Sequence, residues 1–76
     1  MNAQRRKQIT AAQEKIRAAI EALETLRDEE QDSFENLPES MQQGERGEKM
    51  QSAVDSIESA IGDLENAESS LEEATQ

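Results

Sequence analysis

Carboxylates dominate the side chains of this sequence that could do chemistry. The 76 residues include eighteen Asp and Glu but no His and no Cys. Without an imidazole or a thiol, the usual pairs of nucleophile and base cannot be assembled, and the nitrogen and sulfur ligands that transition metals prefer are absent. We therefore expect a protein that is not an enzyme, with no catalytic residue, no cofactor and no metal site.

The densest acidic stretch covers residues 28–32, with the sequence DEEQD. Carboxylates can ligate a divalent cation, but consecutive residues of a helix point in different directions, and no EF-hand loop is present. A second pattern places Glu58, Glu65 and Glu72 seven residues apart, which is about 10 Å along a helix. Such a row is typical of a solvated face. Mimicry of nucleic-acid phosphates is an alternative, although phosphates on one strand lie closer together.

Arg46 and Lys49 are the remaining candidates for binding a ligand. They stand three residues apart near the start of a predicted helix, where backbone N–H groups and the helix dipole attract anions. A small anionic or nucleotide ligand held there would make the protein a sponge for that ligand. Two observations oppose this hypothesis. Glu45 and Glu48 directly precede Arg46 and Lys49 and would repel an anion, and we expect Lys49 to pair with Glu29 on the other arm.

Composition places this chain close to disordered proteins, but its periodicity indicates a folded one. The formal net charge is −10, and 33% of the residues are hydrophobic. Apolar residues recur every seven positions, which is typical of a coiled coil.

No apolar run approaches the roughly 20 residues of a membrane span, and the basic N-terminus lacks the apolar core of a secretory signal. We therefore expect a cytoplasmic protein that binds no membrane. Direct nucleic-acid binding is not expected either, because the basic cluster at residues 5–7 is short and lacks aromatics.

The heptad pattern predicts an all-α fold, an antiparallel two-helix hairpin that forms a single domain over residues 1–76. We expect a first helix over about residues 3–35, a connection over about residues 36–47 and a second helix over about residues 48–74.

Specific residues should begin, end and reverse these elements. Asn2 is the expected N-cap of the first helix, and Pro38 prevents that helix from continuing. Gly44 and Gly47 should permit the chain to reverse.

Two rows of apolar residues should form the seam between the helices. The large row is Ile9, Ile16, Leu23, Met50, Ile57 and Leu64, and the alanine row is Ala12, Ala19, Leu26, Ala53, Ala60 and Ala67. We expect facing residues to have numbers that sum to 76, because large side chains then face alanines in most layers and interdigitate with them.

A third row, the β-branched row, consists of Ile20, Val54 and Ile61 beside the predicted seam. A lone hairpin with that seam would leave this row in water, and exposed apolar stripes on small proteins mark interfaces. We expect hairpins to pair through it into a homo-oligomer, with a dimer favoured and a four-helix bundle as the result. As alternatives, a helix of a partner protein covers the row, or the three side chains are simply exposed.

The connection is longer than an antiparallel helical turn needs, and it carries apolar residues. Its candidate recognition residues are Phe34, Leu37, Pro38, Met41, Arg46 and Lys49. One interpretation is structural, with the apolar side chains covering the end of the bundle. The other is that this loop is a recognition site, because long ordered loops often carry function.

Residues 27–46 contain the run DEEQ, the single Phe, the Asn, Pro and Glu of the segment NLPE, a Gln and the Glu45-Arg46 pair. With these features the stretch resembles a block found in small, acidic, uncharacterised proteins of bacteriophages and bacterial mobile elements. The resemblance implies two helical arms and a bacterial host, and it assigns no site or activity. Small phage proteins of this shape often bind and block a host component, including host defence. The expected function is therefore a non-enzymatic, self-associating binding protein that inhibits a host factor.

Overall fold

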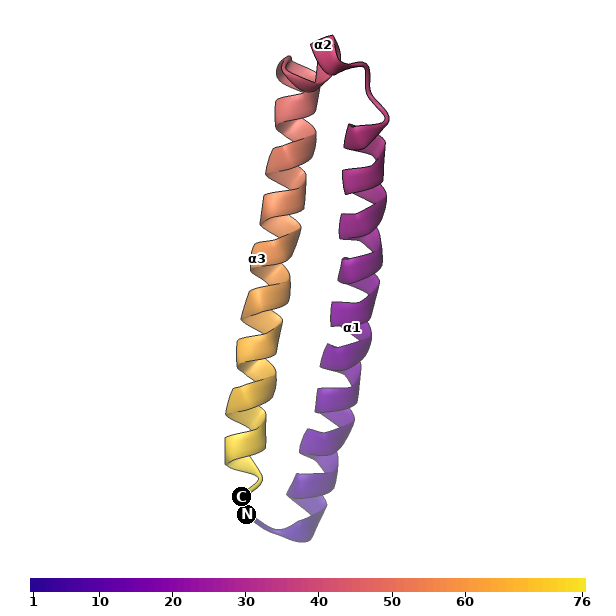
Figure 1. Ribbon diagram of the computed structural model, residues 1–76. Coiled ribbons are helices and arrows are strands. Elements are labelled where there is room, and N and C mark those ends of the chain that lie inside the picture. The colour runs from indigo at the N-terminus through magenta and orange to yellow at the C-terminus, as the bar shows by residue number, and fades with distance from the viewer.

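The computed structural model describes all 76 residues as an extended antiparallel hairpin 58 Å long (Figure 1). Helix α1 (Ala3–Glu35) and helix α3 (Glu45–Ala74) run side by side, and the short helix α2 (Glu39–Gln42) lies in the connection. The two termini meet at the end opposite α2 (Figure 1). The predicted all-α hairpin is confirmed. Neither long helix contains a stretch apolar enough to span a bilayer.

Side chains satisfy the backbone at both ends of α1. At its start, Asn2 is the N-cap, and its Oδ1 accepts a hydrogen bond of 2.8 Å from the Arg5 N–H. At its end, the last carbonyl groups have no partners within the helix. The side-chain amide of Gln42 reaches back from α2 and donates to the carbonyl oxygens of Phe34 (3.2 Å) and Leu37 (3.1 Å). Gln42 thereby ties the connection to α1.

Gly47 allows α2 to lie directly against the first turns of α3. It is buried, and a Cβ placed on it would lie 2.7 Å from the Cα of Gln42 and closer still to the carbonyl group. No glycine has a positive φ, so the expected role of the glycines in reversing the chain needs correction. Gly47 acts through close approach, and Gly44 is an extended N-cap with φ −91°. Helix α3 therefore begins at Glu45, three residues before the predicted start.

The core of the hairpin is the β-branched row. Ile20, Val54 and Ile61 are 0%, 5% and 6% exposed, and they are the only buried hydrophobic residues. The prediction that a lone hairpin leaves them in water is wrong. Side chains that are already packed between α1 and α3 cannot also bind a second hairpin, so this row no longer supports self-association.

The two rows predicted to form the seam have different outcomes. All six members of the large row are at least half-buried in the hairpin. In the alanine row, by contrast, Ala12 and Ala19 are exposed and Leu26 is 51% exposed, so their predicted place in the seam is wrong. The alanine-row residues of α3 are half-buried. Both helices are thus rotated about their axes, and the β-branched row replaces the alanine row inside.

Burial energy explains this rotation. Burying a Val or Ile side chain completely stabilises a fold by about 1.5–3 kcal/mol, whereas one methyl group contributes about 0.8 kcal/mol. Each β-branched residue therefore gains more on burial than the alanine that precedes it in the sequence, and the rotation still leaves the alanine-row residues of α3 half-buried. The alanine row is left on one broad face of the hairpin.

Two polar contacts join the long helices and define their register. Arg17 binds Glu68, and Gln51 donates to Gln31, so the paired residue numbers sum to 85 and 82. The predicted sum of 76 is wrong, because each α1 residue faces an α3 residue six to nine positions further along, about two helical turns. The reason is that the chain reverses around residues 41–42, in α2, rather than at Pro38.

Gly62 lies within α3 without a packing role, so its replacement by Ala should stabilise the hairpin. An added Cβ would meet no atom within 4 Å. Because Gly62→Ala reduces the freedom of the unfolded chain, we expect the free energy of unfolding to rise by about 0.5–1 kcal/mol. Thermal unfolding at one fixed protein concentration should show a higher Tm. A lower Tm would mean that another chain packs against this position.

Candidate interaction surfaces

The seam gives the hairpin two broad faces. We count positions from residues 6, 13, 20, 27 and 34 of α1 and residues 47, 54, 61, 68 and 75 of α3, one side of the buried seam. At 3.6 residues per turn, the residues that follow each of these by one or by four positions lie on one face, as Glu21 and Glu24 do for Ile20. The residue one position before and the residue two positions after lie on the other face, as Ala19 and Ala22 do for Ile20. Because the helices are antiparallel, equivalent sides of α1 and α3 share a face. We name the two surfaces the acidic face and the alanine face.

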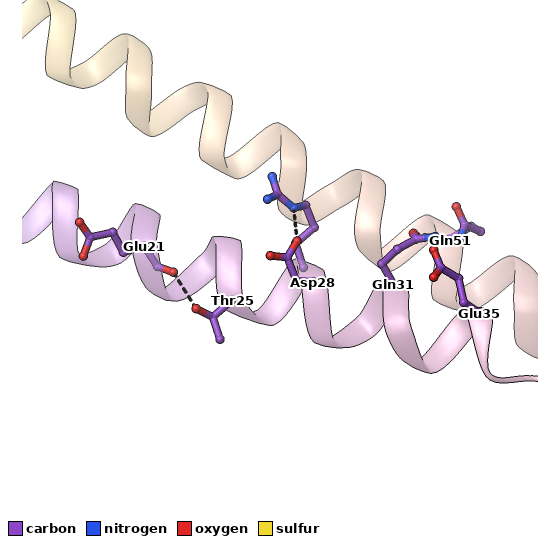
Figure 2. A network of polar contacts seen from close by, with 7 residues as sticks. Glu21, Thr25, Asp28, Gln31, Glu35 and Gln51 are labelled. Carbon is purple, nitrogen blue, oxygen red and sulfur yellow. Dashed lines mark hydrogen bonds and ion pairs between the residues drawn. The ribbon is translucent and has the colours of Figure 1, made fainter.

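The acidic face carries most of the negative charge of the protein. Ten of the eighteen carboxylates lie there, against the two bases Lys7 and Arg17, which leaves a net charge of −8. Among the ten, only Asp28 makes an ion pair, with Arg27 at 3.2 Å (Figure 2). The face therefore presents uncompensated negative charge to solvent. Its carboxylates are Glu14, Glu21, Glu24, Asp28, Glu35, Glu48, Asp55, Glu58, Glu65 and Glu72.

Both polar contacts between the long helices lie on this acidic side of the seam. The Arg17 guanidinium donates to both carboxylate oxygens of Glu68, at 3.0 and 2.6 Å. Nearer the connection, the Gln51 amide donates to Gln31 at 3.3 Å, and Gln31 donates to Glu35 at 3.2 Å (Figure 2). No buried side-chain polar atom lacks a partner. These contacts hold the two helices in register and leave no buried polar group aimed at a ligand.

The alanine face is almost free of acidic residues. It carries two carboxylates and four bases, a net charge of +2. The alanine row runs along its centre, with Leu26 as the largest exposed side chain of that row. The face is therefore apolar in the middle and close to neutral at its margins. Its charged residues are Arg5, Lys15, Glu29, Arg46, Lys49 and Asp63.

A shallow polar groove of about 580 Å³ lies near the termini, between α1 and α3. No hydrophobic residue lines it, and its charged residues are Glu14, Arg17, Glu68 and Glu72. Pockets for small ligands are usually enclosed and mostly apolar, so the groove lacks the features of such a site. The acidic stretch over residues 28–32 also forms no site, because no three acidic side chains converge to hold a metal ion.

The apolar residues of the predicted recognition loop divide into two pairs. Phe34 and Leu37 are half-buried, which agrees with the structural interpretation that they cover the end of the hairpin. Pro38 is exposed, and Met41 is 39% exposed. The loop thus presents one large apolar side chain, Met41, at the tip of the molecule.

The basic residues of the predicted loop do not form a pocket. Arg46 and Lys49 are exposed within α3, and neither lines the groove. Lys49 binds Glu45 at 3.2 Å on its own helix, so the expected pair with Glu29 does not form. The α3 N-terminus also begins with two acidic residues in its first turn. Nothing in this arrangement favours a bound anion.

Sequence reasoning missed Gln42, because glutamine in a connection carries no recognisable signal. We expect Gln42→Ala to lower the free energy of unfolding by about 0.5–1.5 kcal/mol, since the carbonyl oxygens of Phe34 and Leu37 lose the Gln42 amide as a donor, and only Phe34 keeps another one, the Leu37 N–H at 3.0 Å. Gln43→Ala is the matched control, because the Gln43 side chain is exposed and forms no hydrogen bond. Urea unfolding measures the difference, and equal midpoints for the two variants would contradict a stabilising role for the hydrogen bonds of the Gln42 amide.

The fold defines this chain as an all-α antiparallel helical hairpin with one acidic and one nearly neutral broad face. No protein-family model matches it, and neither a curated protein nor a solved structure shows significant similarity to it. The resemblance of residues 27–46 to phage proteins therefore stays a prediction.

Proposed function

We propose that this protein is a non-enzymatic binding protein that self-associates and contacts a host factor through its acidic face. The segregation of charge supports this proposal most: ten carboxylates lie on one broad face and two on the other. The nearly neutral face suits contact with another copy. The acidic face then stays outside and is available to a partner.

The chemistry of the acidic face indicates a basic partner surface. A net charge of −8 spread along a 58 Å hairpin attracts positive charge over a long range. Such attraction speeds association and weakens as salt is added. From the resemblance to phage proteins we expect the partner to be a protein of a bacterial host, and covering a basic functional surface of that protein would inhibit it.

Mimicry of nucleic acid is a second candidate function, and the same face favours it. Nine of its ten carboxylates make no ion pair, and they run along both helices. In this version the partner is a protein that binds DNA or RNA, and the carboxylates occupy the positions of phosphates. Competition between this protein and a short duplex for the partner separates mimicry from simple charge pairing.

Capture from a bacterial lysate tests the proposal with matched variants. The acidic-face variant carries Glu58→Gln, Glu65→Gln and Glu72→Gln. The control variant loses the same charge at exposed positions outside both faces, through Asp32→Asn, Glu39→Gln and Glu73→Gln. We expect the acidic-face variant to bind the captured partner about tenfold more weakly than the control does. Binding should also fall steeply between about 0.05 M and 0.5 M salt.

Two results would contradict the proposal. Equal capture by both variants, without salt dependence, would remove the acidic face as the contact. Loss of capture on Met41→Ser alone would place the contact at the loop tip, where Met41 is 39% exposed.

A further inference from the structure

We propose that a second copy of this chain docks on the alanine face, so that two hairpins form a four-helix bundle. This inference rests on the self-association in the proposed function and assigns the face that mediates it. The β-branched row cannot serve, because it is buried between α1 and α3.

The hairpin alone has a very small core. Three hydrophobic residues of 76 are buried, and Leu26 is left 51% exposed on the alanine face. The core of a chain of this size supplies little stability, and small proteins usually add to it with a disulfide, a metal or oligomerisation. This chain contains no cysteine, and no acidic cluster is placed to hold a metal. Oligomerisation is the remaining means.

The alanine face has the area that a stable dimer needs. The hairpin measures 58 by 15 by 12 Å, so a broad face covers about 870 Å². A standard protein–protein interface buries about 800 Å² on each partner. The small side chains of the alanine row also let helices of two copies approach closely. One broad face, covered along its length by a second hairpin, is therefore sufficient.

Charge selects the alanine face and favours a second copy as its occupant. Each chain carries a net charge of −10, so most approaches between two copies are repulsive. The acidic face, with −8, cannot meet itself, whereas the alanine face has two carboxylates, four bases and an apolar centre. A second hairpin also matches this face in length and flatness. Docking through it leaves both acidic faces outside the bundle.

Two neighbouring alanines provide a matched test. Ala19 lies on the alanine face, and Ala18 lies on the outer edge of α1; both are exposed in the hairpin. Ala19→Glu and Ala18→Glu add the same charge to the same helix. We expect the wild type and Ala18→Glu to sediment at twice the chain mass of 8.5 kDa. For Ala19→Glu we expect a dimer dissociation constant raised about 100-fold, because a carboxylate is buried at the interface.

Circular dichroism checks that both variants remain helical, and Ala12→Glu with Ala11→Glu repeats the comparison one heptad away if either fails to fold. An equal effect of Ala18→Glu and Ala19→Glu would overturn the assignment of the face. An unchanged dimer in Ala19→Glu would also overturn the assignment of the face, but it would leave the self-association in the proposed function standing. A wild type that stays at 8.5 kDa at every concentration would overturn both.

Discussion

Ile20→Ala is expected to unfold the hairpin at room temperature. Ile20 is the one completely buried side chain, and it lies in a core of three residues. Truncating a buried Ile to Ala costs about 2–5 kcal/mol, and a core of this size rarely supplies more than about 3–5 kcal/mol. The far-ultraviolet circular dichroism of the variant should therefore lose most of its helical signal.

Leu26→Ala is the matched control for this prediction. It removes a side chain of similar size from a position that is 51% exposed in the hairpin. We expect this variant to keep its helical signal in dilute solution and to change chiefly its association. If Leu26→Ala lost more helical signal than Ile20→Ala, the seam would have to contain the alanine row, and the rotation of the helices would be contradicted.

Gly47→Ala is expected to lower the free energy of unfolding by about 1–3 kcal/mol, the usual cost of overpacking. A decrease would be informative, because replacing Gly by Ala within a helix normally raises the free energy of unfolding by about 1 kcal/mol. Here the new Cβ would run into the backbone of Gln42. Helix α2 would have to move away from α3, and the Gln42 amide would lose its contacts with the end of α1.

Gly44→Ala is the control for Gly47→Ala. Its added Cβ would lie 3.6 and 3.9 Å from two carbonyl oxygens, which is ordinary contact, and its φ of −91° suits any residue. Because Gly is a better N-cap than Ala, Gly44→Ala should cost about 0.5–1 kcal/mol, less than Gly47→Ala. Urea midpoints would then separate the two variants. Identical midpoints would contradict the packing of α2 on α3.

The sequence was sufficient to predict the hairpin and the large row but not the rotation of the helices. Counting from Ile16, the alanine row lies three residues on, at Ala19, and the β-branched row lies four residues on, at Ile20. Both spacings fit a heptad, so periodicity cannot choose between them. Side-chain volume can, because the isoleucine buries more apolar surface than the alanine. Comparing volumes would have placed Ile20 inside.

The register and the charged face depend on contacts that no local pattern reveals. The register follows from where the chain reverses, and that point is set by Gln42 and Gly47 meeting across the connection. The eighteen carboxylates can be counted from the sequence, but which of them share a face follows only from the correct rotation. For this reason the acidic face was expected only as one row of glutamates on the second helix.

Thiol labelling at increasing protein concentration tests most directly whether the β-branched row closes each hairpin and the alanine face joins two of them. The chain has no cysteine, so Val54→Cys and Ala19→Cys each add a single thiol. We predict slow labelling of Val54→Cys at every concentration, because Val54 is only 5% exposed in one hairpin. Ala19→Cys should label fast when dilute and slow down as copies associate. The opposite pattern, with Ala19→Cys always protected and Val54→Cys protected only at high concentration, would contradict both assignments.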